Sequence, residues 1–190
     1  MEKFSIKKHR QYVETRLKTL DKKSIYQYIA LTLEPFLYDR IIMDFLMQLN
    51  PKNPKQIKSL LSKIIAKESI DKEFYQKFFV DLTWNIDDCD HSLFYASEGA
   101  SRFLGSIELL LACMNKYSLV KAINASFVFL DQAEYYQVLC EEDDCLYKKS
   151  MELYDKEINR QISLLNDNNG NILTNNRNQI FDYIEYFYKI

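Results

Sequence analysis

The chain has 190 residues, 47% of them hydrophobic and 27% charged, with a net charge of −2 and only three glycines and three prolines. A soluble domain of this length ordinarily contains about 13 glycines and about nine prolines. This shortage excludes glycine-rich loops that bind phosphates or dinucleotides, and sheet folds that need many tight turns. We therefore expect a single domain over residues 1–190, built from long helices.

The first half of the chain has apolar residues at helical spacing in five segments. Ser24 is expected to cap the second helix, which ends before Pro35 because the residue before a proline avoids the α conformation. Pro35 then suits the first turn of a third helix. Asn53 is expected to cap a fourth helix that Pro54 opens, and Asp71 to cap a fifth. The residues expected to face the core are Ile6, Val13, Leu17 and Leu20; Tyr38, Ile41, Ile42, Phe45 and Leu49; Ile57, Leu60, Leu61, Ile64 and Ile65; and Tyr75, Phe78, Phe79, Leu82 and Ile86.

The second half contains a segment, residues 97–114, that is apolar on almost every side of a helix. Such a helix is normally central and buried. Gly99 and Gly105 lie in its first part, where their small size permits close packing. Two amphipathic helices are expected after it, at residues 118–140 and 144–165. The sequence thus predicts an all-α bundle of about seven to eight helices around a buried central helix.

The end of the chain changes character after Leu165. An asparagine-rich stretch of loop composition leads into an apolar, aromatic tail over residues 177–190. An exposed apolar tail of this kind docks on a protein surface. We favour docking on its own bundle, and docking on another chain is the alternative.

One segment carries a family resemblance. The acidic run Asp87-Asp88-Cys89-Asp90 is followed by Tyr95, by Ala100 and by the apolar helix to Met114. In this order it resembles the YjaG-like family, catalogued as domain of unknown function 416. The resemblance covers residues 24–172 and leaves the aromatic tail outside. It implies a bacterial, all-helical, cytoplasmic protein without an established activity, so it assigns no catalytic residues.

The stretch 81–98 is acidic and contains no lysine or arginine. Its carboxylates, with Cys89 and His91 between them, are ligand types for a divalent metal. Because they are crowded into one loop, we favour a loop whose acids cap a helix start. A metal site and a patch that binds a partner are the alternatives. The carboxylates are Asp81, Asp87, Asp88, Asp90 and Glu98.

A second acidic run lies between Cys140 and Cys145. It consists of Glu141, Glu142, Asp143 and Asp144. Two cysteines are half of a structural zinc site, which needs four ligands. We therefore interpret the segment as a charged turn between helices, and we expect no metal and no cofactor.

Other function classes have little support in the sequence. The only two histidines are His9 and His91, so a nucleophile–histidine triad would depend on one of them. His9 is expected to be partly buried and hydrogen-bonded. The first helix is basic, but a pI of 5.8 and an acidic remainder argue against nucleic acid. No apolar run reaches the ~20 residues that span a membrane, and no signal peptide is visible, so we expect a cytoplasmic protein.

The charge distribution suggests a function. Residues 1–67 carry 14 Lys/Arg and six Asp/Glu, a charge of +8, and residues 68–190 carry 11 and 21, a charge of −10. We favour the interpretation that these charges are solvated helix faces that complement each other within one domain. An acidic surface that meets a partner is the alternative. We expect a non-enzymatic domain, of immunity-like or regulatory type, whose acidic, tyrosine-rich surface binds another, basic protein. A second copy of the chain is an alternative partner, and a metal-binding or hydrolytic enzyme centred on Asp87, Asp88, Asp90 and His91 is the alternative function. The residues expected to bind the partner are Asp87, Asp88, Asp90, Tyr95, Glu98, Glu141, Glu142, Asp143 and Asp144.

Overall fold

The computed structural model describes residues 6–87, 94–139, 142 and 144–166. All secondary structure in these ranges is helical, which confirms the predicted all-α bundle. The elements are α1 (Ile6–Leu17), α2 (Lys22–Leu33), the 3₁₀ helix η1 (Glu34–Tyr38), α3 (Arg40–Leu49), α4 (Asn53–Ile65), α5 (Lys72–Asp87), α6 (Phe94–Asn115), α7 (Leu119–Leu139) and α8 (Asp144–Leu165).

Two of the predicted helix starts are wrong, and in both cases an aspartate provides the cap. Asp21, not Ser24, caps α2, because its Oδ1 accepts a hydrogen bond from the Ser24 amide at 3.0 Å. Pro35 does not open α3 but lies in the separate 3₁₀ helix η1. Helix α3 begins after Asp39, whose Oδ1 accepts from the Ile42 amide at 3.1 Å. A carboxylate in this position satisfies an amide that the helix leaves unpaired.

At the starts of α4 and α5, one prediction is wrong and two are confirmed. Asn53 does not cap α4 with its side chain. Its Nδ2 instead donates to the Leu46 carbonyl at 3.0 Å, which ties α4 to α3. Pro54 lies in the first turn of α4, as predicted. The predicted cap of α5 is confirmed, because Asp71 Oδ1 accepts from the Phe74 amide at 3.0 Å.

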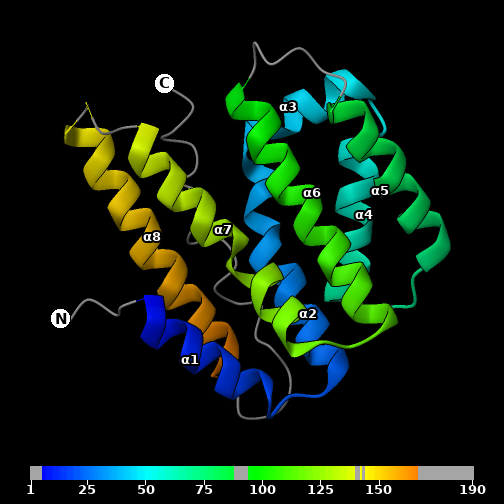
Figure 1. Cartoon of the computed structure of the whole chain (residues 1–190), viewed down its shortest axis with the longest axis horizontal. Coiled ribbons are helices and arrows are strands. Elements are labelled where there is room, and N and C mark those ends of the chain that lie inside the picture. The colour runs from blue at the N-terminus through cyan, green and yellow to red at the C-terminus, as the bar shows by residue number, and fades with distance from the viewer. Residues whose placement is uncertain (1–5, 88–93, 140–141, 143, 167–190) are drawn as a thin grey trace.

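Helix α2 runs through the middle of the molecule, between the α6–α5–α4 side and the α7–α8–α1 side (Figure 1). It packs against α4, α6, α7 and α8. From Ser24 to Leu33 every residue is buried except the half-buried Tyr26. A helix enclosed on all sides has to be apolar nearly all round, as the sequence of α2 is.

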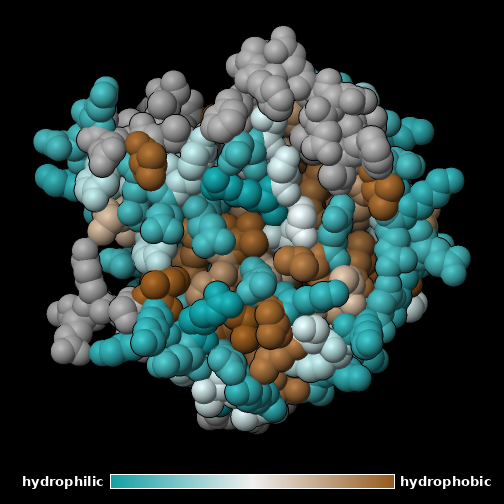
Figure 2. Space-filling view, in the orientation of Figure 1, coloured by the Kyte–Doolittle hydropathy of each residue, from teal (hydrophilic) through white to brown (hydrophobic). Residues whose placement is uncertain are grey.

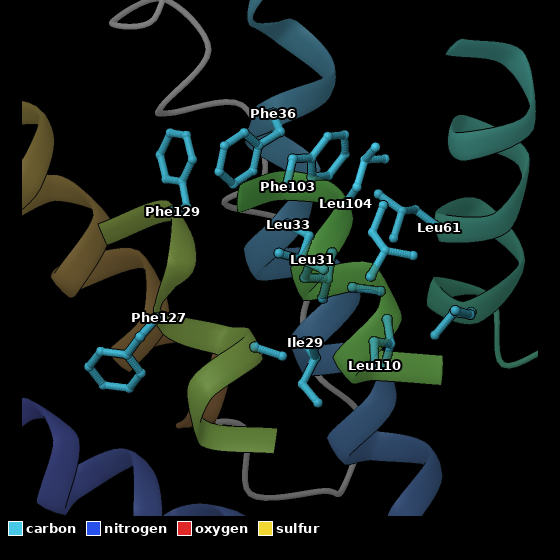
Figure 3. Packing of buried hydrophobic residues seen from close by; sticks show 14 of the residues in the cluster. Ile29, Leu31, Leu33, Phe36, Leu61, Phe103, Leu104, Leu110, Phe127 and Phe129 are labelled. Atoms are coloured by element: carbon cyan, nitrogen blue, oxygen red, sulfur yellow. The ribbon is translucent and has the colours of Figure 1, made fainter. Parts of the chain in front are cut away.

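The predicted central helix, residues 97–114, lies within α6 and packs against α2, α3, α5 and α7, so its central place is confirmed. It is not buried on every side, because Ser101 and Glu108 are exposed. The buried side chains between α6 and the end of α2 are aromatic. The Phe36 ring stacks on Phe103 with centroids 4.7 Å apart, and Phe129 of α7 meets Phe36 edge-on at 5.1 Å (Figure 3). These three rings join η1, α6 and α7 in arrangements that aromatic pairs prefer.

Two of the residues in the first half of the chain that were predicted to face the core are exposed. Ile6 is 45% exposed because it is the first residue of α1, and Tyr38 is 43% exposed because it ends η1. In Figure 2 hydrophobic atoms gather toward the middle of the visible face, and hydrophilic ones border them. None of the described helices combines the length and apolar character required to cross a membrane.

The two glycines of α6 differ in their surroundings. A Cβ added at Gly99 would lie 2.5 Å from Ile42 Cδ1 and 2.9 Å from Ile42 Cγ1, so α3 approaches α6 closely there. The predicted close packing is confirmed at Gly99. It is wrong at Gly105, where an added Cβ would meet nothing within 4 Å.

We predict that Gly99→Ala and Gly105→Ala have opposite effects on stability. Alanine at 105 gains helix propensity and should raise the free energy of unfolding by about 0.5–1 kcal/mol. Alanine at 99 pushes the buried Ile42 away and should be about 1–3 kcal/mol less stable than the variant at 105. Urea unfolding followed by circular dichroism measures both. Equal stability of the two variants would show that α3 moves away from residue 99 without a loss of stability, and it would contradict this prediction.

Candidate functional site

The first predicted acidic cluster falls mostly outside the described residues. Asp87 is the last residue of α5, while Asp88, Asp90 and His91 lie beyond the described ranges. The metal-binding or hydrolytic centre predicted on these residues therefore stays a prediction. In the part of the chain that the structure does describe, no three or more His, Cys, Asp and Glu side chains are grouped to hold a metal ion.

Tyr95 and Glu98 lie in the first turns of α6. A hydrogen-bonded ion pair joins Glu98 Oε2 to Arg102 NH2 at 2.9 Å, one turn along the helix. The Arg102 guanidinium also lies over the ring of Tyr135 on α7, 4.6 Å from its centroid. A partly exposed pair of this kind contributes little stability. Glu98 therefore joins a mixed cluster with an arginine and a tyrosine.

The second predicted acidic cluster is described in part. Glu142 is exposed, and the exposed Asp144 is the first residue of α8. Glu141 and Asp143 lie outside the described ranges. A carboxylate in the first turn of a helix interacts favourably with the helix dipole, so Asp144 has a structural reason to be acidic.

The fold gathers a further acidic surface that the sequence analysis did not identify. Asp131 and Glu134 on α7 and Asp155 on α8 all act electrostatically on Tyr154. Burial and these three carboxylates raise the pKa of Tyr154. Loss of hydration and then repulsion from Glu134 raise the pKa of Asp131, and the positive charges of Arg102 and Arg10 oppose this in part. We call these four residues the α7–α8 acidic face. Only the packing of α7 on α8 brings them together, so no local spacing signals the whole set.

A buried ion pair lies inside the bundle. Glu157 is fully buried and Arg160 is 4% exposed. Arg160 Nε donates to Glu157 Oε2 at 2.7 Å, its NH2 donates to Oε1 at 2.9 Å, and its NH1 donates to the Leu31 carbonyl of α2 at 2.9 Å. This two-pronged geometry is the strongest form of the Arg–carboxylate interaction. The pair fixes α8 against α2.

Gln161 extends this pair into a network. Its Nε2 donates to Glu157 Oε1 at 2.8 Å and to the Ser126 carbonyl of α7 at 3.0 Å. Its Oε1 lies 2.9 Å from His9 Nε2 and accepts from the Tyr28 hydroxyl at 3.3 Å. The five side chains of the network are all buried, so a substrate cannot reach them. They are His9, Tyr28, Glu157, Arg160 and Gln161. We interpret it as a link between α1, α2, α7 and α8.

His9 differs from its predicted state. It is fully buried rather than partly buried, and among the described residues its Nδ1 has no hydrogen-bond partner. Its ring lies 5.3 Å from that of Phe127. Burial lowers the pKa of His9 below the ordinary 6.5, and the hydrogen bond to Gln161 opposes this only in part.

An open groove lies on the surface between η1, α3 and α4, with a volume of about 480 Å³. Its lining is largely apolar on the η1 and α3 side and carries lysines on the α4 side. Several of its side chains are exposed, among them Tyr38 at 43% and Met47 at 47%. We call it the α3–α4 groove. Its lining residues are Glu34, Leu37, Tyr38, Met43, Asp44, Met47, Pro54, Lys55, Lys58 and Ser62.

The sequence analysis did not predict this groove, although one local signal was present. Met43 and Met47 are one helical turn apart and lie beside the stripe of Ile42 and Phe45 that α3 buries. Large apolar residues off the buried stripe indicate a second apolar contact surface. The other walls come from η1, which contains Pro35, and from α4, and only the folded chain places them opposite α3.

We predict that the buried ion pair is far more sensitive to truncation than the exposed one. Arg160→Met leaves the Glu157 carboxylate buried without its partner and should cost about 3–5 kcal/mol of unfolding free energy. The matched variant Arg102→Met on the surface should cost about 1 kcal/mol or less. Adding Glu157→Gln to Arg160→Met should restore part of the loss. Similar losses in urea unfolding for the two single variants would contradict this interpretation.

We also predict that acid destabilises the fold through His9. Because the folded-state pKa lies below 6.5, the unfolded chain binds more protons as the pH falls through 6.5. The stability is fully present above pH 6.5 and decreases below it. His9→Phe removes the titration and leaves Gln161 Oε1 with its bond from Tyr28, so its unfolding free energy should change less between pH 7 and pH 5.5. Identical pH slopes for the two proteins would exclude His9 as the cause.

Comparison of the chain with protein-family models, with curated proteins and with solved structures found no match. The resemblance to the YjaG-like family therefore stays a prediction.

Proposed function

We propose that this chain is a protein-binding domain and that the α3–α4 groove is a binding site for a partner. The observation that supports this most is the concave, solvent-open surface in which Leu37, Tyr38, Met43 and Met47 gather. Single exposed apolar residues are ordinary on a soluble protein, but a group of them in one groove marks an interaction site.

The shape of the groove suits a peptide segment better than a compact small molecule. On α4 the lining residues Lys55, Lys58 and Ser62 follow one another at steps of three and four, and on α3 Met43 and Met47 do the same. The α4 row spans seven residue steps, from Lys55 to Ser62, about 10 Å at 1.5 Å per residue. Two helical rows at this spacing match the anchors of an amphipathic segment, which recur at the same steps.

The chemistry of the lining fits contact with a protein. Methionine is flexible and polarisable, so Met43 and Met47 can adapt to the shape of an inserted side chain. Tyr38 offers a large ring with a polar hydroxyl, a combination enriched at protein interfaces. A volume of about 480 Å³ accommodates a few large apolar side chains of a partner.

A second candidate surface is the α7–α8 acidic face. The convergence of Asp131, Glu134 and Asp155 around Tyr154 favours it as a site for a basic protein, as in an immunity-like or regulatory domain. Like the surface predicted from the sequence, this face is acidic and contains a tyrosine, but it consists of other residues. The clusters at 87–98 and 141–144, the cytoplasmic location and the enzymatic alternative at Asp87 stay predictions.

We predict that a photo-cross-linking residue, p-benzoylphenylalanine, at position 47 joins the chain to one discrete partner in its native host. The same residue at Val120, which is 64% exposed on α7 and outside the groove, is the matched control and should not give that product. With the purified partner, Met47→Ser should raise the Kd about tenfold, since it removes apolar contact area equivalent to about 1.4 kcal/mol. Calorimetry measures the Kd.

Two results would contradict the proposal. One is the same cross-linked product from positions 47 and 120, which would place the contact elsewhere. The other is an unchanged Kd for Met47→Ser when circular dichroism shows that the variant is folded. If the partner instead loses affinity on Glu134→Gln, the α7–α8 acidic face is the binding site.

A further inference from the structure

The two long walls of the α3–α4 groove differ in charge. Helix α4 contains Lys55, Lys58 and Lys63 and no acidic residue. Lys55 and Lys58 line the groove and are exposed. Within the described part of the chain neither of these two lysines forms an ion pair or a hydrogen bond. Their positive charges are therefore available to a bound molecule.

The opposite wall carries a single exposed carboxylate, Asp44 of α3. Glu34 also lines the groove, but its side chain is only 3% exposed and interacts with other protein groups. The groove is therefore positive along α4 and apolar on the η1 and α3 side, where Asp44 adds one negative charge. A bound segment experiences a different charge on each of its two flanks.

This pattern defines the partner. We propose, building on the function proposed above, that the groove binds an amphipathic helix of another protein whose apolar stripe covers Met43 and Met47 and whose acidic flank faces Lys55 and Lys58. The flank that faces Asp44 is neutral or basic. A helix with a basic flank on the α4 side is disfavoured, because like charges placed opposite each other at an interface repel.

The electrostatic part of this recognition has a measurable magnitude. Exposed ion pairs are individually weak, so the two lysines affect the choice between partners more than the affinity for any one partner. We expect an acidic and a basic version of the same helix to differ about tenfold in Kd at low salt. The difference should shrink at 1 M salt, where the Debye length falls to about 3 Å.

Three synthetic helical peptides of 18 residues test this inference on the full chain. All share one stripe of leucines at steps of four, three and four, and one flank carries Glu, Gln or Lys. Fluorescence anisotropy of the labelled peptides should give the affinity order Glu, then Gln, then Lys. The double variant Lys55→Glu/Lys58→Glu should reverse this order, and Met47→Ser should weaken all three peptides.

A matched charge control separates the groove from the general charge of the protein. Lys116 and Lys121 are exposed at the junction of α6 and α7 and do not line the groove. Lys116→Glu/Lys121→Glu changes the net charge by the same amount and should leave the order of the peptides unchanged. If this control reverses the order as well, the selection arises from net charge and the inference is wrong.

The remaining outcomes distinguish the inference from the proposed function. Equal binding of all three peptides, weakened by Met47→Ser, would support a protein-binding groove and overturn the charge selection. Absence of binding by every peptide would overturn the inference, while the cross-linking result at position 47 would still decide the function. Sedimentation of the chain alone as a dimer that Met47→Ser dissociates would show that a second copy occupies the groove.

Discussion

Helix α2 is enclosed by protein from Ser24 to Leu33, apart from the half-buried Tyr26, and this enclosure determines how the other helices are arranged. A helix that is apolar nearly all round is stable only where neighbours remove all of its surface from water. Helices α4, α6, α7 and α8 provide that cover, and α1, α3 and α5 complete the outer parts of the bundle. The three-ring contact of Phe36, Phe103 and Phe129 closes the upper end of α2 in Figure 3. The fold is thus organised around the burial of one helix.

Enclosure also removes the polar groups of α2 and its neighbours from water. Several of them are paired inside the bundle, while Gln27 Oε1 of α2 and both polar side-chain atoms of Gln132 on α7 have no hydrogen-bond partner among the described residues. The Leu31 carbonyl accepts from Arg160, and the Tyr28 hydroxyl donates to Gln161. Because unpaired buried polar groups are costly, such a network accepts few alternative arrangements. The network therefore gives His9, Glu157 and Arg160 a structural role in the bundle. His9 then becomes sensitive to acid as a consequence of its burial.

The surface that remains is divided by charge and by shape. The basic excess of residues 1–67 lies partly on α4, beside the α3–α4 groove, and part of the acidic excess lies on the α7–α8 acidic face. These surfaces are built from different helices, so partners of opposite charge would bind at different places. The short 3₁₀ helix η1 separates α2 from α3 and provides one wall of the groove. The segment that interrupts the helices at Pro35 therefore forms part of a candidate binding site.

The sequence by itself determined the helical class and the central helix at 97–114, because both follow from the local spacing of apolar residues. It placed one cap correctly, at Asp71. It missed Asp21, because Ser24 was the expected cap, and Asp39, because the helix was expected to begin at Pro35. Only the tertiary structure decided the candidate sites. The groove, the acidic face and the pairing of His9 with Gln161, 152 residues apart, all combine side chains from separate helices. Local spacing carries no information about which helix faces meet, since that depends on packing of the whole chain.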